Sequence, residues 1–354
     1  MIRSQPSSPS AATRALRVFV AVLLGATALL TAAQRLGASD AGWLELTRFL
    51  PFPVVLAPSL FALLLATRLG RGWTLASLAS LALVASVTMG LEWHRGSPAG
   101  VGAMPIRLMT YNVKATLAAQ RPDGMAALAR EVARHDPDIL VMQDAHDSTG
   151  APAAELLSGG RVFGYPHVHA AGQYIVASRF ALHGCVQRPI GPPSDEHRYL
   201  RCTVQAGPTA LTLVTVHFDS PREGLNAARR EGLEGFGEWQ RNHDGRLAQA
   251  RALATDLAPL LAPGAAPLIV AGDLNAPPSS PVMATLRTAG LRDAFSAAGR
   301  GYGYTYGHAL RIGFRFLRID HALVSAAIGV AACTTGGTDA SQHRPVIAEL
   351  RLGG

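Results

Sequence analysis

The chain has 354 residues, of which 49% are hydrophobic and 16% are charged, and its formal net charge is +8. Soluble proteins carry about 25% charged residues, so this composition excludes an intrinsically disordered chain and indicates membrane segments. Eight arginines and three acidic residues lie in residues 1–98, which gives that part a net charge of +5 and leaves +3 for residues 99–354. The basic excess therefore gives little support for a nucleic-acid partner.

Three stretches near the N-terminus lack charged residues: Val18 to Gln34, Phe49 to Thr67 and Gly72 to Leu91. A spanning helix needs about 20 mostly apolar residues, so we expect about three transmembrane helices. Prolines in the second stretch predict an irregular first half. The first stretch alone also fits a cleaved signal peptide, since Arg14 and Arg17 precede it.

The arginines that flank these stretches predict the orientation, because they concentrate on the cytoplasmic side of membrane proteins. With a cytoplasmic N-terminus, five arginines lie inside and three outside: Arg3, Arg14, Arg17, Arg68 and Arg71 against Arg35, Arg48 and Arg95. We expect a cytoplasmic tail at 1–14, a three-helix transmembrane anchor at 15–93, a linker at 94–104 and a globular domain at 105–354. This predicts a multi-pass protein of the inner cell membrane with an extracytoplasmic domain.

The cysteines are compatible with an extracytoplasmic domain. Cys185 and Cys202 lie in two strand-like segments separated by a turn-rich segment, so they fit a disulfide. Buried free thiols are an equally good interpretation. Cys333 has no metal-type spacing and receives no role.

The globular part alternates strand-like and helix-like segments. The expected strands are Ile106 to Tyr111, Ile139 to Gln143, Tyr174 to Ser178, Leu211 to Phe218, Pro267 to Ala271, His321 to Val324 and Val346 to Leu352. The expected helices are Arg121 to Arg134, Arg246 to Leu261 and Pro281 to Ala289. This order predicts an α/β fold in which helices cover β-sheets.

Polar residues gather where the expected strands end. They are Asn112, Asp144, His217, Asp273, Asn275, Asp320 and His343. Any one of them alone is more typical of a turn, or, for His217 in an apolar strand, of a core histidine. Six such segments together are hard to explain as turns and indicate a site.

These residue types favour metal-assisted attack of water on a phosphate ester. Carboxylate and amide oxygens with few sulfur ligands suit Mg²⁺ or Mn²⁺. Such an ion polarises the phosphoryl oxygen and neutralises charge in the transition state. Two histidines near acidic residues provide hydrogen bonds or proton transfer near neutral pH.

The segments that carry these residues resemble the endonuclease/exonuclease/phosphatase superfamily. They are MTYNV, DPDILVMQDAH, TVHF, AGDLNAPP, LRIDHALVS and SQHRPVIAEL, in the order and spacing of that family. The resemblance implies a four-layer α/β sandwich of two mixed sheets flanked by helices. The short multi-span N-terminus also makes the chain similar to the VanJ-type membrane branch.

The resemblance implies a divalent metal held by Asp144, Asn112 and Asp320. Asn112 would lie close to both the metal and the substrate phosphate. Asn275 and His343 would also bind the phosphate.

The resemblance also implies the proton-handling residues. Asp273 would orient or deprotonate the attacking water, and Asp320 would hold His343 in the right tautomer. His343 would then stabilise the transition state, with His217 as a second histidine.

Two departures from the family pattern bear on metal affinity. The family usually has Glu where this chain has Asp144, and Asp where it has Gln342. One shorter and one missing carboxylate should weaken Mg²⁺ binding.

Three functions follow as hypotheses. The leading one is a membrane-anchored, metal-dependent phosphoesterase acting outside the cytoplasm on a lipid-linked phosphate or a phospholipid. The second is a surface endonuclease, for which arginines after His217 would form a basic patch, although interleaved glutamates there also predict a solvated helix. The third is a catalytically degenerate domain that binds a phosphorylated ligand.

Overall fold

The computed structural model describes residues 10–36, 40–97, 103–157, 160–191, 197–307 and 314–353. The chain divides into two compact units. The helical unit comprises 1–39 and 47–91, and the globular unit comprises 40–46 and 92–354. The globular unit thus includes residues 40–46, which lie within the expected anchor at 15–93, and residues 98–102 of the expected linker lie outside the described residues.

Among the described residues of the helical unit, one helix is long and apolar enough to cross a membrane, α1 (Ala11–Leu36). The second expected span is interrupted at Pro51, and α2 (Gly42–Arg48) and α3 (Phe52–Ala66) meet the length criterion only when taken together as one bent pair. The third forms α4 (Arg71–Leu83), which continues as a π-helical segment, Val84–Thr88. Three full-length spans were therefore too many, because proline cannot continue the hydrogen-bonding ladder of a helix and α4 stops short of the required length.

The interior of the helical unit is built from small and polar side chains. The Thr31 and Thr88 hydroxyls are 2.8 Å apart, and those of Ser59 and Ser80 are 3.0 Å apart. Ala62 and Ala66 pack against α1. Large apolar side chains instead point outwards, including Val18, Leu29, Leu64 and Leu75. This is the inverse of a water-soluble bundle and is typical of helices packed in lipid.

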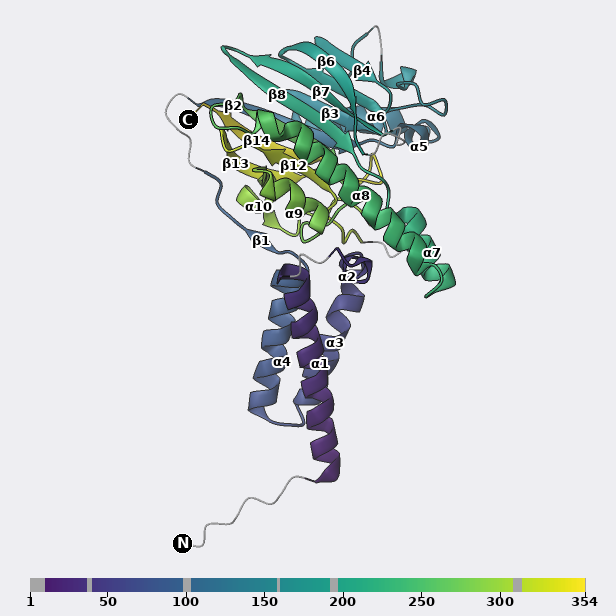
Figure 1. The fold of residues 1–354 in the computed structure, drawn as a ribbon, viewed down its shortest axis with the longest axis vertical. Helices are drawn as coiled ribbons and strands as arrows, with labels where there is room; N and C mark the ends of the chain where they lie inside the picture. The colour runs from purple at the N-terminus through teal and green to yellow at the C-terminus, as the bar shows by residue number, and fades with distance from the viewer. Residues whose placement is uncertain are drawn as a thin grey trace. The chain divides into compact units, whose positions relative to one another are not determined.

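The globular unit contains two six-stranded mixed sheets (Figure 1). The first has the order β10 (Arg292–Asp293), β12 (Asp320–Val324), β9 (Leu268–Asp273), β8 (Thr209–His217), β7 (Arg198–Ala206), β6 (Ala181–Pro189). The second has the order β13 (Ile328–Thr335), β14 (Val346–Leu352), β2 (Met104–Asn112), β3 (Ile139–Gln143), β5 (Tyr174–Ser178), β4 (His167–Ala171). One neighbouring pair in each sheet is parallel, β8 with β9 and β2 with β3.

Helices cover the outer faces of both sheets. The largest core cluster joins residues of the two sheets, such as Leu108 and Val141 with Leu213 and Ile269. A second cluster packs β2 and β3 against α6 (Gly124–His135), and a third packs β8 and β9 against α8 (Phe236–Leu257) and α9 (Pro281–Thr288). The expected α/β fold of two mixed sheets flanked by helices is confirmed.

Shorter elements complete the globular unit. They are α5 (Ala115–Ala119), α7 (Arg222–Glu231), α10 (Ala294–Ala298), 3₁₀ turns at Ala154–Leu156 and Ala258–Leu260, and a small sheet of β1 (Glu92–Trp93) with β11 (Arg300–Gly301). The charged segment after His217 forms α7 and the start of α8, and Arg222 and Arg229 there are exposed beside Glu223 and Glu231. This is the solvated helix that the interleaved charges predict.

Residues 40–46, which precede the second apolar stretch, pack against α8. The Trp239 indole Nε1 donates to the Gly42 carbonyl at 2.6 Å, and the Gly42 amide donates to Gln240 Oε1 at 2.9 Å. Glu45 is fully buried and accepts a 2.6 Å hydrogen bond from the Ser280 hydroxyl. This segment is therefore a structural part of the globular unit.

The structure contains a disulfide between Cys185 on β6 and Cys202 on β7. These strands are neighbours in the first sheet, so the two cysteines face each other across one strand pair. Cys333 is buried and free. Of the two interpretations that the sequence leaves open, the structure has the disulfide.

Candidate active site

Strand register brings three of the candidate residues side by side. In the first sheet, Asp273 on β9 pairs with Asp320 on β12 on one side and with His217 on β8 on the other. In the second sheet, Asn112 pairs with Gln143 at the ends of the parallel strands β2 and β3. The site therefore lies where the carboxyl ends of both parallel pairs meet.

The Gly-Asp-Leu-Asn turn after β9 holds two of these side chains. A Cβ atom on Gly272 would lie 1.8 Å from the Val216 carbonyl oxygen, so only glycine allows β9 to approach β8 this closely. Asp273 Oδ1 accepts a 3.0 Å hydrogen bond from the Asn275 amide, and Asn275 has a φ of 47°, a conformation that asparagine tolerates. Asn275 Nδ2 donates to the Phe218 carbonyl at 2.8 Å.

Asp320 and His343 form a buried pair. His343 Nδ1 lies 2.9 Å and 3.2 Å from the two Asp320 carboxylate oxygens. The Tyr306 ring packs on the imidazole, with 4.5 Å between ring centroids. These contacts orient the imidazole ring from two sides, which leaves Nε2 as the nitrogen that Asp320 does not engage.

His217 joins the acidic residues of the two sheets. Its Nε2 lies 3.6 Å from Asp273 Oδ2, and its Nδ1 lies 3.7 Å from Asp144 Oδ1. Gln173 Oε1 lies 2.6 Å from Nδ1, and the His217 backbone amide donates to the Tyr174 hydroxyl. The side chain that resembles a core histidine in the sequence thus contacts two acidic site residues.

Asp144 is paired with the chain's only lysine. Lys114 Nζ donates to Asp144 Oδ2, and His146 Nε2 lies 3.5 Å from Asp144 Oδ1. Asp144 has a φ of 49°, which favours a short polar side chain over the longer glutamate that the family usually has. Lys114 stands two residues after Asn112, and its uniqueness in this arginine-rich chain was the one sequence signal that marked it.

Asn112 connects the two sheets at the centre of the site. The side chain is fully buried, and its Nδ2 donates to Asp273 Oδ2 at 3.0 Å. The Ser341 hydroxyl donates to the Asn112 carbonyl oxygen at 2.8 Å, which ties the loop before His343 to the end of β2.

Burial and neighbouring charges shift the ionisation of the acidic residues. Burial and the adjacent Asp320 raise the pKa of Asp273, and burial raises the pKa of Asp320 to about 7. Burial also lowers the pKa of His343 to about 4. Burial of Asp144 acts to raise its pKa, but the combined effect of His217, His146 and Lys114 holds the pKa below its usual range. Two buried carboxylates side by side thus lack a compensating cation, whereas Asp144 has one in Lys114.

The donor set fits a hard divalent cation. Asp273, Asp320 and His343 each offer a ligand atom, and these atoms lie within 4.8 Å of one another. Oxygen donors that dominate such a group suit Mg²⁺ or Mn²⁺. A cation here would also relieve the repulsion between the two buried carboxylates.

The structure brings all seven candidate residues into one connected cluster. His217 contacts both Asp144 and Asp273. Asp273 in turn contacts Asn112 and Asn275 and pairs with Asp320, which binds His343. Gln342 is partly exposed. Several residues that contact the cluster were not singled out from the sequence, among them Lys114, His146, Gln173 and Tyr306.

A family model now decides the classification. The model for the endonuclease/exonuclease/phosphatase family matches residues 109–343, which is well over half of the chain and includes all seven candidate residues. The chain belongs to this family. Members of the endonuclease/exonuclease/phosphatase family are phosphoesterase and nuclease hydrolases.

Solved structures with the same fold are distant in sequence. An endonuclease/exonuclease/phosphatase from Beutenbergia cavernae is 20% identical, with a TM-score of 0.51 and coverage of 71% of this chain and 72% of that chain. One from Bacteroides vulgatus is 18% identical, with a TM-score of 0.52 and coverage of 71% and 100%. A mannosyl-6-phosphatase from Bacteroides thetaiotaomicron is 15% identical, with a TM-score of 0.50 and coverage of 69% and 99%. At these identities the likeness establishes the fold of this family member and leaves its substrate open, and no curated protein matches the chain.

Proposed function

We propose that this family member is a membrane-anchored, metal-dependent phosphoric ester hydrolase that acts outside the cytoplasm. The observation that carries the proposal is the buried group of Asp273, Asp320 and His343, joined to His217 and Asn112 where the two sheets meet. Such a group combines acidic oxygens for a cation with imidazoles for a phosphate, and turns alone do not require that combination.

His343 and Asn275 would donate hydrogen bonds to the phosphate oxygens. Asp320 accepts from Nδ1 of His343, so Nε2 would face the substrate and, once the ring is protonated, would donate to the charge that develops on the phosphate. Asn275 uses one amide N–H on the Phe218 carbonyl and keeps a second for a phosphate oxygen.

Asp273 would act on the attacking water. Its raised pKa brings this carboxylate closer to neutral pH, where a proton acceptor is most effective. Asn112 Nδ2 and the Asn275 amide donate to its two oxygens and fix its orientation.

We propose Mg²⁺ or Mn²⁺ as the cofactor, held by Asp144, Asn112 and Asp320 or by the neighbouring group that contains Asp273. When bound, the ion would polarise the phosphoryl oxygen and offset negative charge in the transition state. The Lys114 contact to Asp144 favours a second candidate function, a degenerate domain that binds a phosphorylated ligand without a metal.

The membrane anchor and the substrate class rest on the helical unit. Its polar contacts and apolar exterior support insertion of α1, with the shorter α3 and α4 packed against it, as a membrane anchor similar to the VanJ type. The Cys185–Cys202 disulfide supports an oxidising compartment outside the cytoplasm. An enzyme tethered in this way favours a substrate at the bilayer surface, a lipid-linked phosphate or a phospholipid.

The activity is tested with the full chain in detergent micelles. Phosphate release from a lipid pyrophosphate, headgroup release from a phospholipid and strand cleavage of DNA are measured with Mg²⁺, with Mn²⁺ and with EDTA. We expect metal-dependent turnover of a lipid substrate and a loss of about 10²-fold or more in Asp273→Ala and His343→Ala. Arg229→Gln, on the exposed face of α7, is the matched control and should keep full activity. Undiminished turnover in both active-site variants would refute the proposed site.

The orientation is tested separately by a reporter fused at the C-terminus. Alkaline phosphatase is active only outside the cytoplasm, whereas green fluorescent protein fluoresces only when it folds in the cytoplasm. Active alkaline phosphatase and a dark fluorescent fusion are expected, and the opposite pattern would place the domain in the cytoplasm.

A further inference from the structure

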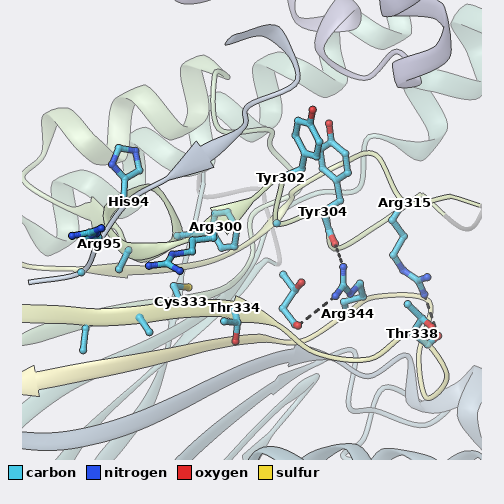
Figure 2. Close-up of a pocket in the computed structure, with 17 residues that line it drawn as sticks. His94, Arg95, Arg300, Tyr302, Tyr304, Arg315, Cys333, Thr334, Thr338 and Arg344 are labelled. Carbon is cyan, nitrogen blue, oxygen red and sulfur yellow. Dashed lines mark hydrogen bonds between the residues drawn. The ribbon is translucent and has the colours of Figure 1, made fainter. Parts of the chain in front are cut away.

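A cavity of about 800 Å³ lies in the globular unit, and none of the seven candidate site residues lines it (Figure 2). Its walls come from the segment after β1, the loop that contains Tyr302 and Tyr304, one face of β13 and the loops around Thr338 and Arg344. A volume of this size is within the range of small-molecule sites.

The lining of this cavity is cationic. Arg95, Arg300, Arg315 and Arg344 line it together with His94, and none of its lining residues is acidic. Within the described part of the chain, none of the four arginines forms a salt bridge. The Arg315 and Arg344 guanidinium groups repel each other, and the Asp339 and Glu131 carboxylates offset part of their charge. An anion in the cavity would relieve the remaining repulsion.

The arginines are held in place by the backbone and by an aromatic ring. Arg344 donates to the Gly336 and Tyr304 carbonyl oxygens at 2.7 Å and 3.3 Å, and Arg315 donates to that of Thr338 at 3.2 Å. The Arg300 guanidinium lies over the Trp93 ring, 5.6 Å from its centroid. Carbonyl groups satisfy donors but leave the positive charge in place.

Arg315 and Arg344 are also partly desolvated. Burial lowers the pKa of both, and for Arg344 the charge of Arg315 lowers it further. Arg315 Nε is buried with no hydrogen-bond partner among the described residues. A buried donor without a partner is destabilising, and a ligand oxygen that reached it would satisfy it.

The other lining groups fit an anion with a polar or planar body. The rings of Tyr302 and Tyr304 stack with 5.1 Å between centroids and an 11° interplanar angle (Figure 2). Thr334 and Thr338 also line the cavity. Planar guanidinium groups bind phosphate oxygens with two parallel hydrogen bonds, which a lysine does not match.

We infer that this cavity is a binding site for a phosphate monoester or pyrophosphate group, separate from the catalytic cluster. The group belongs either to a soluble molecule or to a lipid headgroup. His94 follows Leu91, the last residue of the apolar helical unit, by three residues, which makes a lipid phosphate one of the two sources to be separated.

The test is calorimetric titration of inorganic pyrophosphate into the full chain in phosphatidylcholine nanodiscs, with EDTA present so that no metal-dependent turnover occurs. Wild type should bind, and Arg300→Gln and Arg315→Gln should each weaken the affinity about tenfold or more. Arg300 is exposed, so Arg300→Gln keeps the test valid if Arg315→Gln unfolds. Arg229→Gln on α7 removes the same charge elsewhere and should bind like wild type.

The lipid source is separated by replacing part of the phosphatidylcholine with phosphatidic acid. A lipid headgroup as ligand lowers the apparent pyrophosphate affinity of wild type but not that of Arg300→Gln, whereas a soluble ligand leaves the wild-type affinity unchanged. Absence of pyrophosphate binding, or equal weakening by Arg229→Gln, would overturn the inference. Because the test measures pyrophosphate binding in EDTA and not turnover, failure of this inference is distinct from failure of the proposed hydrolysis.

Discussion

At the scale of single residues, the site is governed by which charges are compensated. Asp144 has Lys114 and two histidines around it, whereas Asp273 and Asp320 are buried side by side with raised pKa values. The structure therefore divides the acidic residues into one that is already neutralised by the protein and two that favour an added cation.

Lys114→Met tests this division. Removing the ammonium group leaves Asp144 uncompensated, so Mn²⁺ should bind about tenfold more tightly than to wild type. Titration calorimetry of the full chain measures the affinity, and Lys114→Arg, which keeps the charge, should resemble wild type. Weaker Mn²⁺ binding in Lys114→Met would mean that Lys114 supports the metal site instead of competing with it.

Asp320→Asn tests the orientation of His343. The amide keeps the size of the side chain but removes the negative charge that accepts from Nδ1 and stabilises a protonated imidazole, so Nε2 becomes a weaker donor to the phosphate and turnover should fall about 10²-fold to 10⁴-fold. Substrate affinity should change much less than the turnover rate. Initial-rate kinetics measure both quantities, and a variant with wild-type turnover would show that the pair has only a structural role.

At the scale of elements, α8 connects the site to the segment that precedes the second apolar stretch. It follows β8 and His217, and its Trp239 and Gln240 bind Gly42. His243, one turn further along, is fully buried, and neither ring nitrogen has a hydrogen-bond partner among the described residues.

The burial of His243 predicts a pH dependence of stability. Burial lowers its folded-state pKa, while the unfolded value is about 6.5. Above that pH the residue is neutral in both states; as pH falls below it, the unfolded chain takes up a proton that the folded chain resists, so the free energy of unfolding decreases. Chemical unfolding at pH 7.5 and 5.5 should show a smaller acid destabilisation in His243→Met, by about 1 kcal/mol. An identical pH dependence in both proteins would exclude His243 as a source.

At the scale of the whole molecule, two units of opposite design share one chain. The helical unit buries many small polar groups and exposes large apolar ones. The globular unit instead buries one apolar cluster between its two sheets and one between each sheet and the helices that cover it. Each arrangement suits a different solvent, lipid for the first and water for the second.

The disulfide joins two neighbouring strands of the globular unit. It joins residues 17 apart in the sequence, so removing it should lower the free energy of unfolding by about 3 kcal/mol. Thermal unfolding with and without dithiothreitol measures the effect, and the double variant Cys185→Ser with Cys202→Ser should be insensitive to the reductant. If the reductant leaves wild type unchanged, the disulfide does not contribute to stability.

Sequence patterns alone determined the strands that form both sheet centres and the residues that end them. The seven expected strands occur at β2, β3, β5, β8, β9, β12 and β14, because continuous apolar runs bounded by polar turns are a local signal. The edge strands β4, β10 and β13 were not expected, since they are short or partly exposed and lack such a run, and β6 and β7 were expected only as strand-like segments around the two cysteines. The motif order likewise indicated the seven candidate residues, which form one connected cluster in the structure.

Contacts between distant segments were decided only by the tertiary structure. The ion pair of Lys114 with Asp144 and the cavity of four arginines join residues from separate loops, and no spacing along the chain encodes those distances. The number of full-length spans also depended on geometry, because apolar composition measures hydropathy but not where proline interrupts a helix. Local composition specifies which surfaces are buried, whereas strand register and packing specify which charges meet.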